Sequence, residues 1–250
     1  MEDFENIYDK IKELFGDYPN RLAILEEKID ISLQMEYFEM SGKVKKHLNK
    51  EEIMSDSEKL FDPEYSMDSK KELLPMLASV ERVEAYRIIE RFMKDPPPEL
   101  KDWGVLALQE SKMLIESKLL DENKVFISTG LGGKGDNLRY FVVIIGKNIT
   151  EFSEVQKKVI SNEFELTLKR YNSRIEEINF TGSFATLLTM VPMYVTIKQV
   201  FREAINECNQ FGDFLAENFI ITNVKVLNFN EIKEFIERKD QLNNGENLDR

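Results

Sequence analysis

Cysteine and histidine are almost absent from this sequence. Its 250 residues include one cysteine, Cys208, and one histidine, His47. A single cysteine excludes an internal disulfide and a zinc site made of several thiolates. A cysteine–histidine catalytic pair would have to join these two residues, which lie in different halves of the chain. We expect Cys208 to be a buried apolar thiol and His47, within a lysine cluster, to be surface.

Long apolar runs and metal-ligand motifs are also missing. No apolar stretch approaches the roughly 20 residues that a membrane-spanning helix needs. The acidic start, residues 1–5, lacks the basic region and apolar run of a signal peptide. The acidic pairs do not have the spacing of EF-hands or of di-metal helical bundles. The sequence therefore predicts a cytoplasmic protein with no membrane association, no metal site and no indicated cofactor.

Basic residues are in the minority, 34 against 46 acidic ones, for a net charge of −12. The excess is concentrated in residues 1–120, which hold 27 acidic and 18 basic side chains, against 19 and 16 in residues 121–250. Nucleic acids are bound through lysine and arginine, so a nucleic-acid partner is not expected. RNA binding by an exposed sheet face carrying Arg139 and Tyr140 ranks last among the alternatives.

The first half of the chain has helical periodicity throughout. Apolar residues recur at three- and four-residue spacing from Phe4 to Phe15, and Gly16 follows as a stop signal,. A second helix is expected to open at Pro19-Asn20 and to run towards Met40. The remaining predicted helices of this half cover about residues 49–61, 70–79, 80–94 and 99–119.

Residues 73–108 resemble a HEAT-type helical hairpin. The shared elements are a leucine–proline–leucine helix at residues 73–77, an aspartate–proline turn at Asp95-Pro96, and a second helix with small residues on its packing face. The resemblance covers one copy only, whereas a solenoid needs several. It implies a packing geometry and protein binding, and it implies no chemistry.

The second half changes character near Asp121. Two runs rich in β-branched and aromatic residues, residues 124–129 and 138–145, flank a glycine-rich loop, and a second predicted hairpin covers residues 174–180 and 184–191,. Together with three predicted helices and a last strand, the order is ββα-ββα-βα, an antiparallel α+β layout. The predicted divisions are a helical domain at 1–120, an α+β domain at 121–240 and a flexible tail at 241–250. The other predicted elements are helices at about 151–171, 197–211 and 230–238 and a strand at 219–227.

The glycine-rich loop is the strongest candidate for a binding site. Four of the 11 glycines lie within residues 128–137, and three of them satisfy G-x-G-x-x-G. A dinucleotide-binding loop needs a helix directly after it, and here a predicted strand follows. The hairpin also resembles the phosphate-covering loop of protein kinases, but the lysine strand and the catalytic-loop motifs of that family are missing.

The backbone N–H groups of such a loop can still form an anion-binding nest. The residues that we assign to this candidate site are Gly130, Gly132, Gly133, Lys134, Gly135 and Arg139. The alternative is a plain hairpin tip. No catalytic residue is assigned, because no nucleophile and base stand in a recognisable arrangement.

Two functions from different classes follow. The leading hypothesis is a non-catalytic cytoplasmic interaction or regulatory protein with protein partners. The alternative is a binding protein or enzyme that closes the loop at residues 130–137 over a phosphorylated small molecule.

Overall fold

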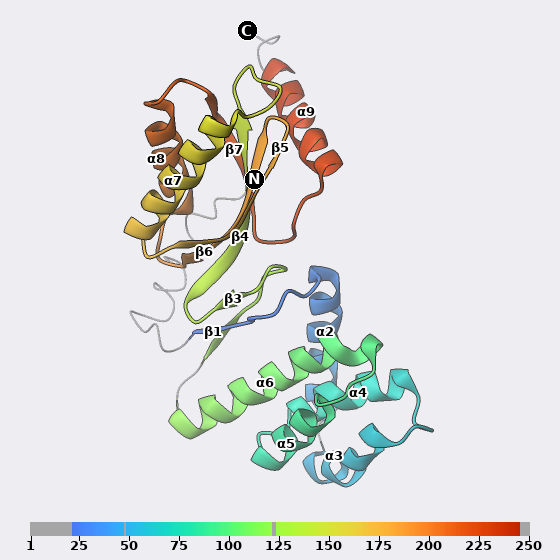
Figure 1. Ribbon diagram of the computed structural model, residues 1–250. Helices are drawn as coiled ribbons and strands as arrows, with labels where there is room; N and C mark the ends of the chain where they lie inside the picture. Colours follow the sequence, from blue (N-terminus) through green and yellow to red (C-terminus); the bar gives the residue numbers. More distant parts are fainter. Residues whose placement is uncertain (1–21, 48, 122–123, 246–250) are drawn as a thin grey trace. The chain divides into compact units, whose positions relative to one another are not determined.

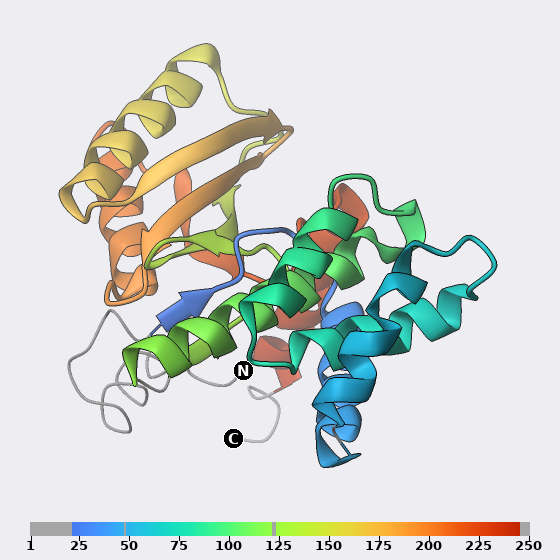
Figure 2. The ribbon, with the colours of Figure 1, turned by 90° about the horizontal axis from the view of Figure 1, so that it is seen from below.

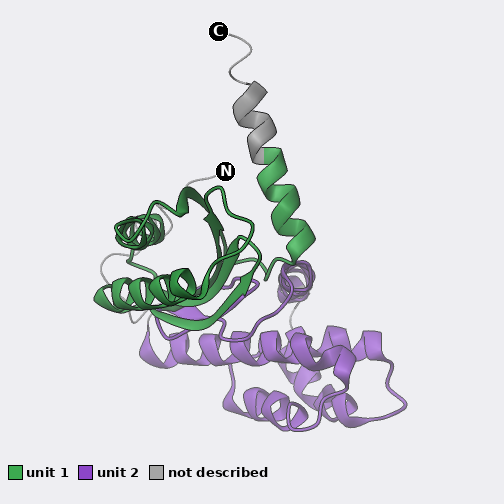
Figure 3. Ribbon diagram, turned by 45° about the horizontal axis from the view of Figure 1, so that its top comes forward, with its two compact units in different colours: residues 1–8, 137–250 green, residues 9–136 purple. Residues whose placement is uncertain are grey.

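The computed structural model describes residues 22–47, 49–121 and 124–245. The described residues up to Asp136 form one compact unit, and those from Asn137 onwards form a second (Figure 3). The boundary lies between Asp136 and Asn137, whereas the sequence predicts it near Asp121. The predicted helix from Phe4 to Phe15 lies outside the described residues.

The first unit is mainly helical (Figure 1). The side chains of Asp30, Asn49 and Ser66 accept hydrogen bonds from first-turn backbone N–H groups and so cap the starts of α2, α3 and α4,. The elements in order are β1 (Leu22–Ile24), α2 (Ile31–Val44), η3 (Lys45–His47), α3 (Lys50–Asp56), η4 (Ser57–Phe61), α4 (Met67–Ala78), α5 (Val83–Phe92), η5 (Pro98–Leu100), α6 (Lys101–Leu120), β2 (Val125–Ile127) and β3 (Gly133–Lys134).

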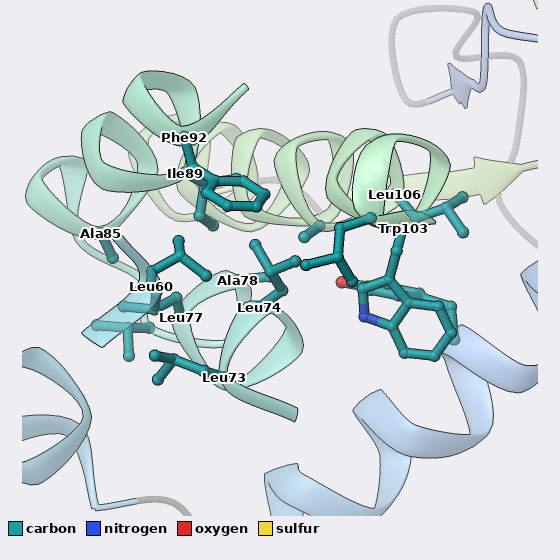
Figure 4. Close-up of a cluster of buried hydrophobic side chains, with 14 of the residues drawn as sticks. Leu60, Leu73, Leu74, Leu77, Ala78, Ala85, Ile89, Phe92, Trp103 and Leu106 are labelled. Carbon is teal, nitrogen blue, oxygen red and sulfur yellow. The ribbon is translucent and has the colours of Figure 1, made fainter. Parts of the chain in front are cut away.

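Apolar side chains from α4, α5, α6 and η4 meet in one core, shown in Figure 4. Burying a side chain of this size contributes about 1.5–3 kcal/mol to stability. The residues labelled in that view are Leu60, Leu73, Leu74, Leu77, Ala78, Ala85, Ile89, Phe92, Trp103 and Leu106.

The single tryptophan completes the hydrogen bonding of a neighbouring helix. Pro75 lies inside α4 and has no N–H to donate to the carbonyl of Lys71, four residues earlier,. The indole N–H of Trp103, on α6, donates to that carbonyl at 2.9 Å. The Lys71 ammonium lies 5.0 Å from the centre of the Trp103 ring, within the range of a cation–π contact,. The fully buried Trp103 therefore joins α6 to α4.

The stretch that resembles a HEAT hairpin, residues 73–108, contains the end of α4, all of α5 and the start of α6. Gly104 allows a close approach here, because a Cβ atom at this position would collide with the Sδ atom of Met93. Residues 95–97 lie in the connection between α5 and η5. The family resemblance itself stays a prediction.

One strand pair of the first unit was not predicted. Residues 22–24 form β1 rather than the start of a helix, and α2 begins only at Ile31. β1 pairs in parallel with β2, with Leu22 opposite Val125. The expected hairpin of residues 124–129 with residues 138–145 is therefore wrong. Parallel strands need a long crossover, and here it contains all the described helices of the unit, α2 to α6, so no local pattern reveals the pairing,.

The second unit is an α+β layer structure. Its elements are β4 (Asn137–Gly146), α7 (Glu154–Arg170), β5 (Arg174–Thr181), β6 (Phe184–Pro192), α8 (Ile197–Asn209), β7 (Leu215–Thr222) and α9 (Phe229–Gly245). The first strand predicted for this domain, residues 124–129, is β2 of the first unit, so the second unit has the order βα-ββα-βα. The predicted α+β class, with helices first and an antiparallel sheet after them, is confirmed.

The long strands of this sheet stand in the order β7-β4-β6-β5, and every neighbouring pair is antiparallel. The sequence from β4 to β7 is thus β-α-β-β-α-β with the first and third strands at the centre. This is the split βαβ, or ferredoxin-like, arrangement. It hosts many unrelated functions, so it does not indicate an activity by itself.

The two faces of the sheet are covered by different helices. Val142 and Ile144 of β4 point into a core with α7 and α8. On the opposite face, Phe184 of β6 meets Phe229 of α9, with 5.8 Å between the ring centres. Figures 1 and 2 agree in placing α7 and α8 on one side of the sheet and α9 on the other.

Two boundaries near the C-terminal end differ from those expected. β7 begins at Leu215 and ends at Thr222, whereas the apolar run suggested 219–227. α9 continues to Gly245, past the predicted end at Arg238 and into the segment predicted as a tail. Residues 246–250 lie outside the described part of the chain.

Candidate functional site

The predicted glycine site divides into a buried part and an exposed tip. Gly130, Gly132 and Gly133 are buried, whereas Lys134 and Gly135 are exposed. The exposed tip is the tight turn between β3 and β4, and Gly135 has a φ of +62° at the first position of its two-residue loop. This is the position that a type II′ hairpin turn reserves for glycine.

The buried part of the loop is packed against backbone. Gly132 has a φ of +66°, and a Cβ atom there would lie 2.5 Å from the carbonyl oxygen of Glu27 and against that of Glu26. The Gly132 N–H donates to the carbonyl of Thr129 at 3.2 Å. Carbonyl oxygens repel anions, and this N–H is already used within the loop. The geometry around Gly132 therefore serves packing.

Arg139, the last residue of the predicted site, lies on β4 and is paired with another strand. Its Nε atom lies 2.5 Å from the Oε2 atom of Glu176 on β5, and only 14% of its side chain is exposed. Arg174 reaches the same carboxylate at 3.7 Å. The Arg139 charge is thus balanced within the sheet. Phosphate binding by the loop stays a prediction.

Tyr140 does not form a stacking platform for RNA. It packs against the core under α7 and α8. Burial raises the pKa of its hydroxyl to about 12. The alternative ranked last, RNA binding, needs an exposed aromatic here, but the strand alternation turns Tyr140 towards the helices and Arg139 away from them,.

The two rare residues lie in different units. Cys208 is fully buried on α8, as predicted, and burial raises the pKa of its thiol to about 12. His47 ends the short helix η3. Among the residues that the structure describes, no three histidine, cysteine, aspartate or glutamate side chains gather as metal ligands would.

A buried carboxylate that sequence reasoning missed connects α2 to α6. Glu110 is 4% exposed. It accepts hydrogen bonds from the hydroxyl of Tyr37 at 2.5 Å, the hydroxyl of Ser41 at 2.7 Å and the ammonium of Lys45 at 2.5 Å. Burial, and then the charge of Glu110, raise the pKa of Tyr37 well above its ordinary value,.

This cluster has the properties of a structural clamp. Its donors Tyr37, Ser41 and Lys45 are all directed at one carboxylate, so a buried charge is compensated where it lies. Glu110 does not line the cleft described below. The one signal in the sequence is an acidic residue three and four positions after the apolar Ala107 and Leu106, on the buried face of a helix.

A cleft of ≈ 320 Å³ opens in the first unit, where the end of α2 meets α3 and α4. Its floor is apolar: Ile53 and Leu73 are buried, and Met76 is half-buried beside them. The residues that line it are Val44, Asn49, Glu52, Ile53, Asp56, Tyr65, Ser69, Glu72, Leu73 and Met76. We call it the α3–α4 cleft.

Three carboxylates stand at the rim of the α3–α4 cleft. Asp56 is paired with Lys59 at 2.9 Å. Glu52 is hydrogen-bonded to the amide of Asn49 at 3.1 Å and forms no ion pair with a described residue. Glu72 is exposed and forms no ion pair with a described residue. The cleft thus combines an apolar floor with three carboxylates, of which only Asp56 forms an ion pair with a described residue.

The sequence shows these residues but not the cleft. Glu51 and Glu52 have the appearance of a charged helix surface, and Leu73 has the appearance of core. Only the packing of α3 beside α4, with Tyr65 from the loop between them, brings the two patterns to one place.

Two further observations concern membrane-spanning helices and similarity to known proteins. Within the described ranges, no helix combines the length and the apolar character that crossing a bilayer requires. No protein-family model matches the chain, and no curated protein matches it significantly.

Proposed function

We propose that this chain is a non-catalytic cytoplasmic interaction or regulatory protein, and that its helical unit binds a segment of a partner protein in the α3–α4 cleft. The cleft carries the proposal. Its apolar floor combines the buried side chains of Ile53 and Leu73 with the half-buried Met76, between α3 and α4. Apolar surface placed beside polar groups is the usual composition of a recognition pocket.

The size of the cleft favours side chains of a protein over a large cofactor. At ≈ 320 Å³ it lies at the lower end of the roughly 300–1,000 Å³ of small-molecule pockets,. Protein interfaces concentrate binding energy in a few anchors that fill such pockets. Met76 adds adaptability, because the unbranched thioether side chain can change shape to fit an anchor.

Site-specific photo-crosslinking in the cells of origin tests the proposal. A benzophenone amino acid replaces Tyr65, which lines the cleft, or Tyr86, a half-buried tyrosine on α5 that does not. We expect a discrete crosslinked protein from position 65 only. Equal crosslinking from both positions would contradict a site in the cleft.

The protein captured at position 65 is then purified and titrated against the full chain. Ser69→Tyr fills the cleft with a neutral ring, and Ser55→Tyr places the same ring on the exposed side of α3. We expect Ser69→Tyr to weaken binding at least tenfold and Ser55→Tyr to leave it unchanged. Binding that survives Ser69→Tyr would refute the proposed function. Fractionation of the same cells checks the cytoplasmic location.

A further inference from the structure

We infer that the segment bound in the α3–α4 cleft is basic, and that it presents a lysine or arginine next to an apolar anchor. This inference rests on the proposed function and names the class of partner for that site. It is carried by the charge and the apolar floor of the cleft together, because neither alone selects an occupant.

Among the described residues, the cleft has more carboxylates than cations: Glu52, Asp56 and Glu72 line it, and Lys59 lies near Asp56 and Glu52. Glu52 of α3 and Glu72 of α4 both line the cleft, and neither forms an ion pair with a described residue. Lys59, the nearby cation, is paired with Asp56 at 2.9 Å. An acidic occupant would be repelled, and a basic one would meet two carboxylates of opposite charge.

The first half of the sequence adds to this field, with 27 acidic and 18 basic side chains in residues 1–120. An excess of one sign steers oppositely charged partners and raises their association rate. The steering weakens with salt, because the Debye length falls from about 30 Å at 0.01 M to about 8 Å at 0.15 M. Binding of a basic segment should therefore depend on ionic strength.

The floor gives the occupant its second requirement. Ile53 and Leu73 form a fixed apolar base, and Met76 forms an adaptable one,. Tyr65 adds an aromatic ring at the edge, a surface on which an arginine can stack,. A leucine, methionine or phenylalanine side chain would fill the base while a neighbouring lysine or arginine reaches the rim.

Fluorescence anisotropy with three peptide pools tests the inference. Each pool holds ten-residue peptides with a Leu-Met centre and random flanks, and two flanking positions are fixed as arginine, serine or glutamate. The protein is the full chain, either unchanged, as Glu52→Gln/Glu72→Gln, or as the matched control Glu84→Gln/Glu99→Gln. The control removes the same charge from exposed positions of the same unit that do not line the cleft.

We expect the arginine pool to bind most tightly and to weaken when salt is raised from 0.05 to 0.3 M. Two exposed ion pairs together favour binding by about fivefold, so Glu52→Gln/Glu72→Gln should weaken the arginine pool by about that factor. The control pair should leave it unchanged. All the substituted side chains are exposed, so circular dichroism should show the same fold for all three proteins.

The other outcomes overturn the inference in distinguishable ways. If the three pools bind equally and Ser69→Tyr abolishes this binding, the proposed function stands, but the inference that the partner segment is basic is refuted. Equal weakening by both double variants would place the effect in the overall charge and not in the cleft. Absence of binding by every pool would also refute the inference, and the crosslinked partner would then decide the proposed function alone.

Discussion

Alanine in place of Gly132 should destabilise the protein much more than alanine in place of Gly135. The two glycines belong to the same loop and have nearly equal φ angles, +66° and +62°. A Cβ atom at position 132 would collide with the backbone carbonyls of Glu26 and Glu27, whereas a Cβ atom at position 135 would meet nothing within 4 Å. The pair therefore separates backbone strain from packing.

The expected magnitudes follow from these two contributions. A left-handed backbone conformation destabilises a residue with a Cβ atom by about 1–2 kcal/mol. Alanine also restricts the unfolded chain more than glycine does, which stabilises the folded protein by about 0.4–1 kcal/mol. Gly135→Ala should therefore lower the free energy of unfolding by about 1 kcal/mol. Gly132→Ala adds an overpacking cost of about 1–3 kcal/mol, because the obstructing atoms are backbone and cannot rotate away. We expect a total loss of about 3 kcal/mol at Gly132.

Urea denaturation followed by Trp103 fluorescence measures both losses, because the single tryptophan lies in the same unit as the two glycines. The midpoint should fall with an unchanged slope, since neither variant alters the surface that unfolding exposes. Losses that agree within about 0.5 kcal/mol would refute the packing of Gly132 on residues 26–27. The glycine-rich pattern would then need another explanation, with anion binding the first to test.

Two further predictions concern buried polar groups. Glu110→Ala should lower the free energy of unfolding by about 3 kcal/mol or more in urea titrations, because it leaves the buried Tyr37 hydroxyl without its acceptor,. Tyr37→Phe should lower it by only about 1 kcal/mol. Similar losses in the two variants would contradict the clamp. Cys208 should resist an aromatic disulfide reagent at pH 8 until the protein unfolds, because burial raises its pKa to about 12, and rapid labelling of the native protein would contradict this,. Because the pKa of the Cys208 thiol is higher in the folded than in the unfolded protein, the neutral buried thiol contributes its full stabilisation below the ordinary thiol pKa. This stabilisation is lost as the pH rises towards 12,.

Local patterns predicted the elements that depend on near neighbours. The apolar stripe of α8 and the hairpin of β5 with β6 are each specified within a few residues, and both appear as expected. The pairing of Leu22–Ile24 with Val125–Ile127 joins segments about a hundred residues apart, and three apolar residues in a row do not identify a partner at that distance. The helix expected at Leu22 failed for this reason.

The candidate sites show the same limit. The sequence assigns Gly132 to a candidate anion-binding loop, and it does not show that a Cβ atom at this position would collide with the carbonyls of residues 26–27. The α3–α4 cleft depends on where Tyr65 and Met76 come to rest after α3 packs on α4. The residue spacing within α3 or within α4 does not predict that these side chains come together.

The contact between Trp103 and α4 bears on how the helical unit acquires its structure. Because Pro75 leaves the Lys71 carbonyl open, α4 has a backbone acceptor that only an indole from a helix more than twenty residues later fills. A nascent chain that ends within α5 has not yet produced this donor. We therefore expect this turn of α4 to become stable when α6 docks, in contrast to repeat arrays whose helical pairs add one after another,.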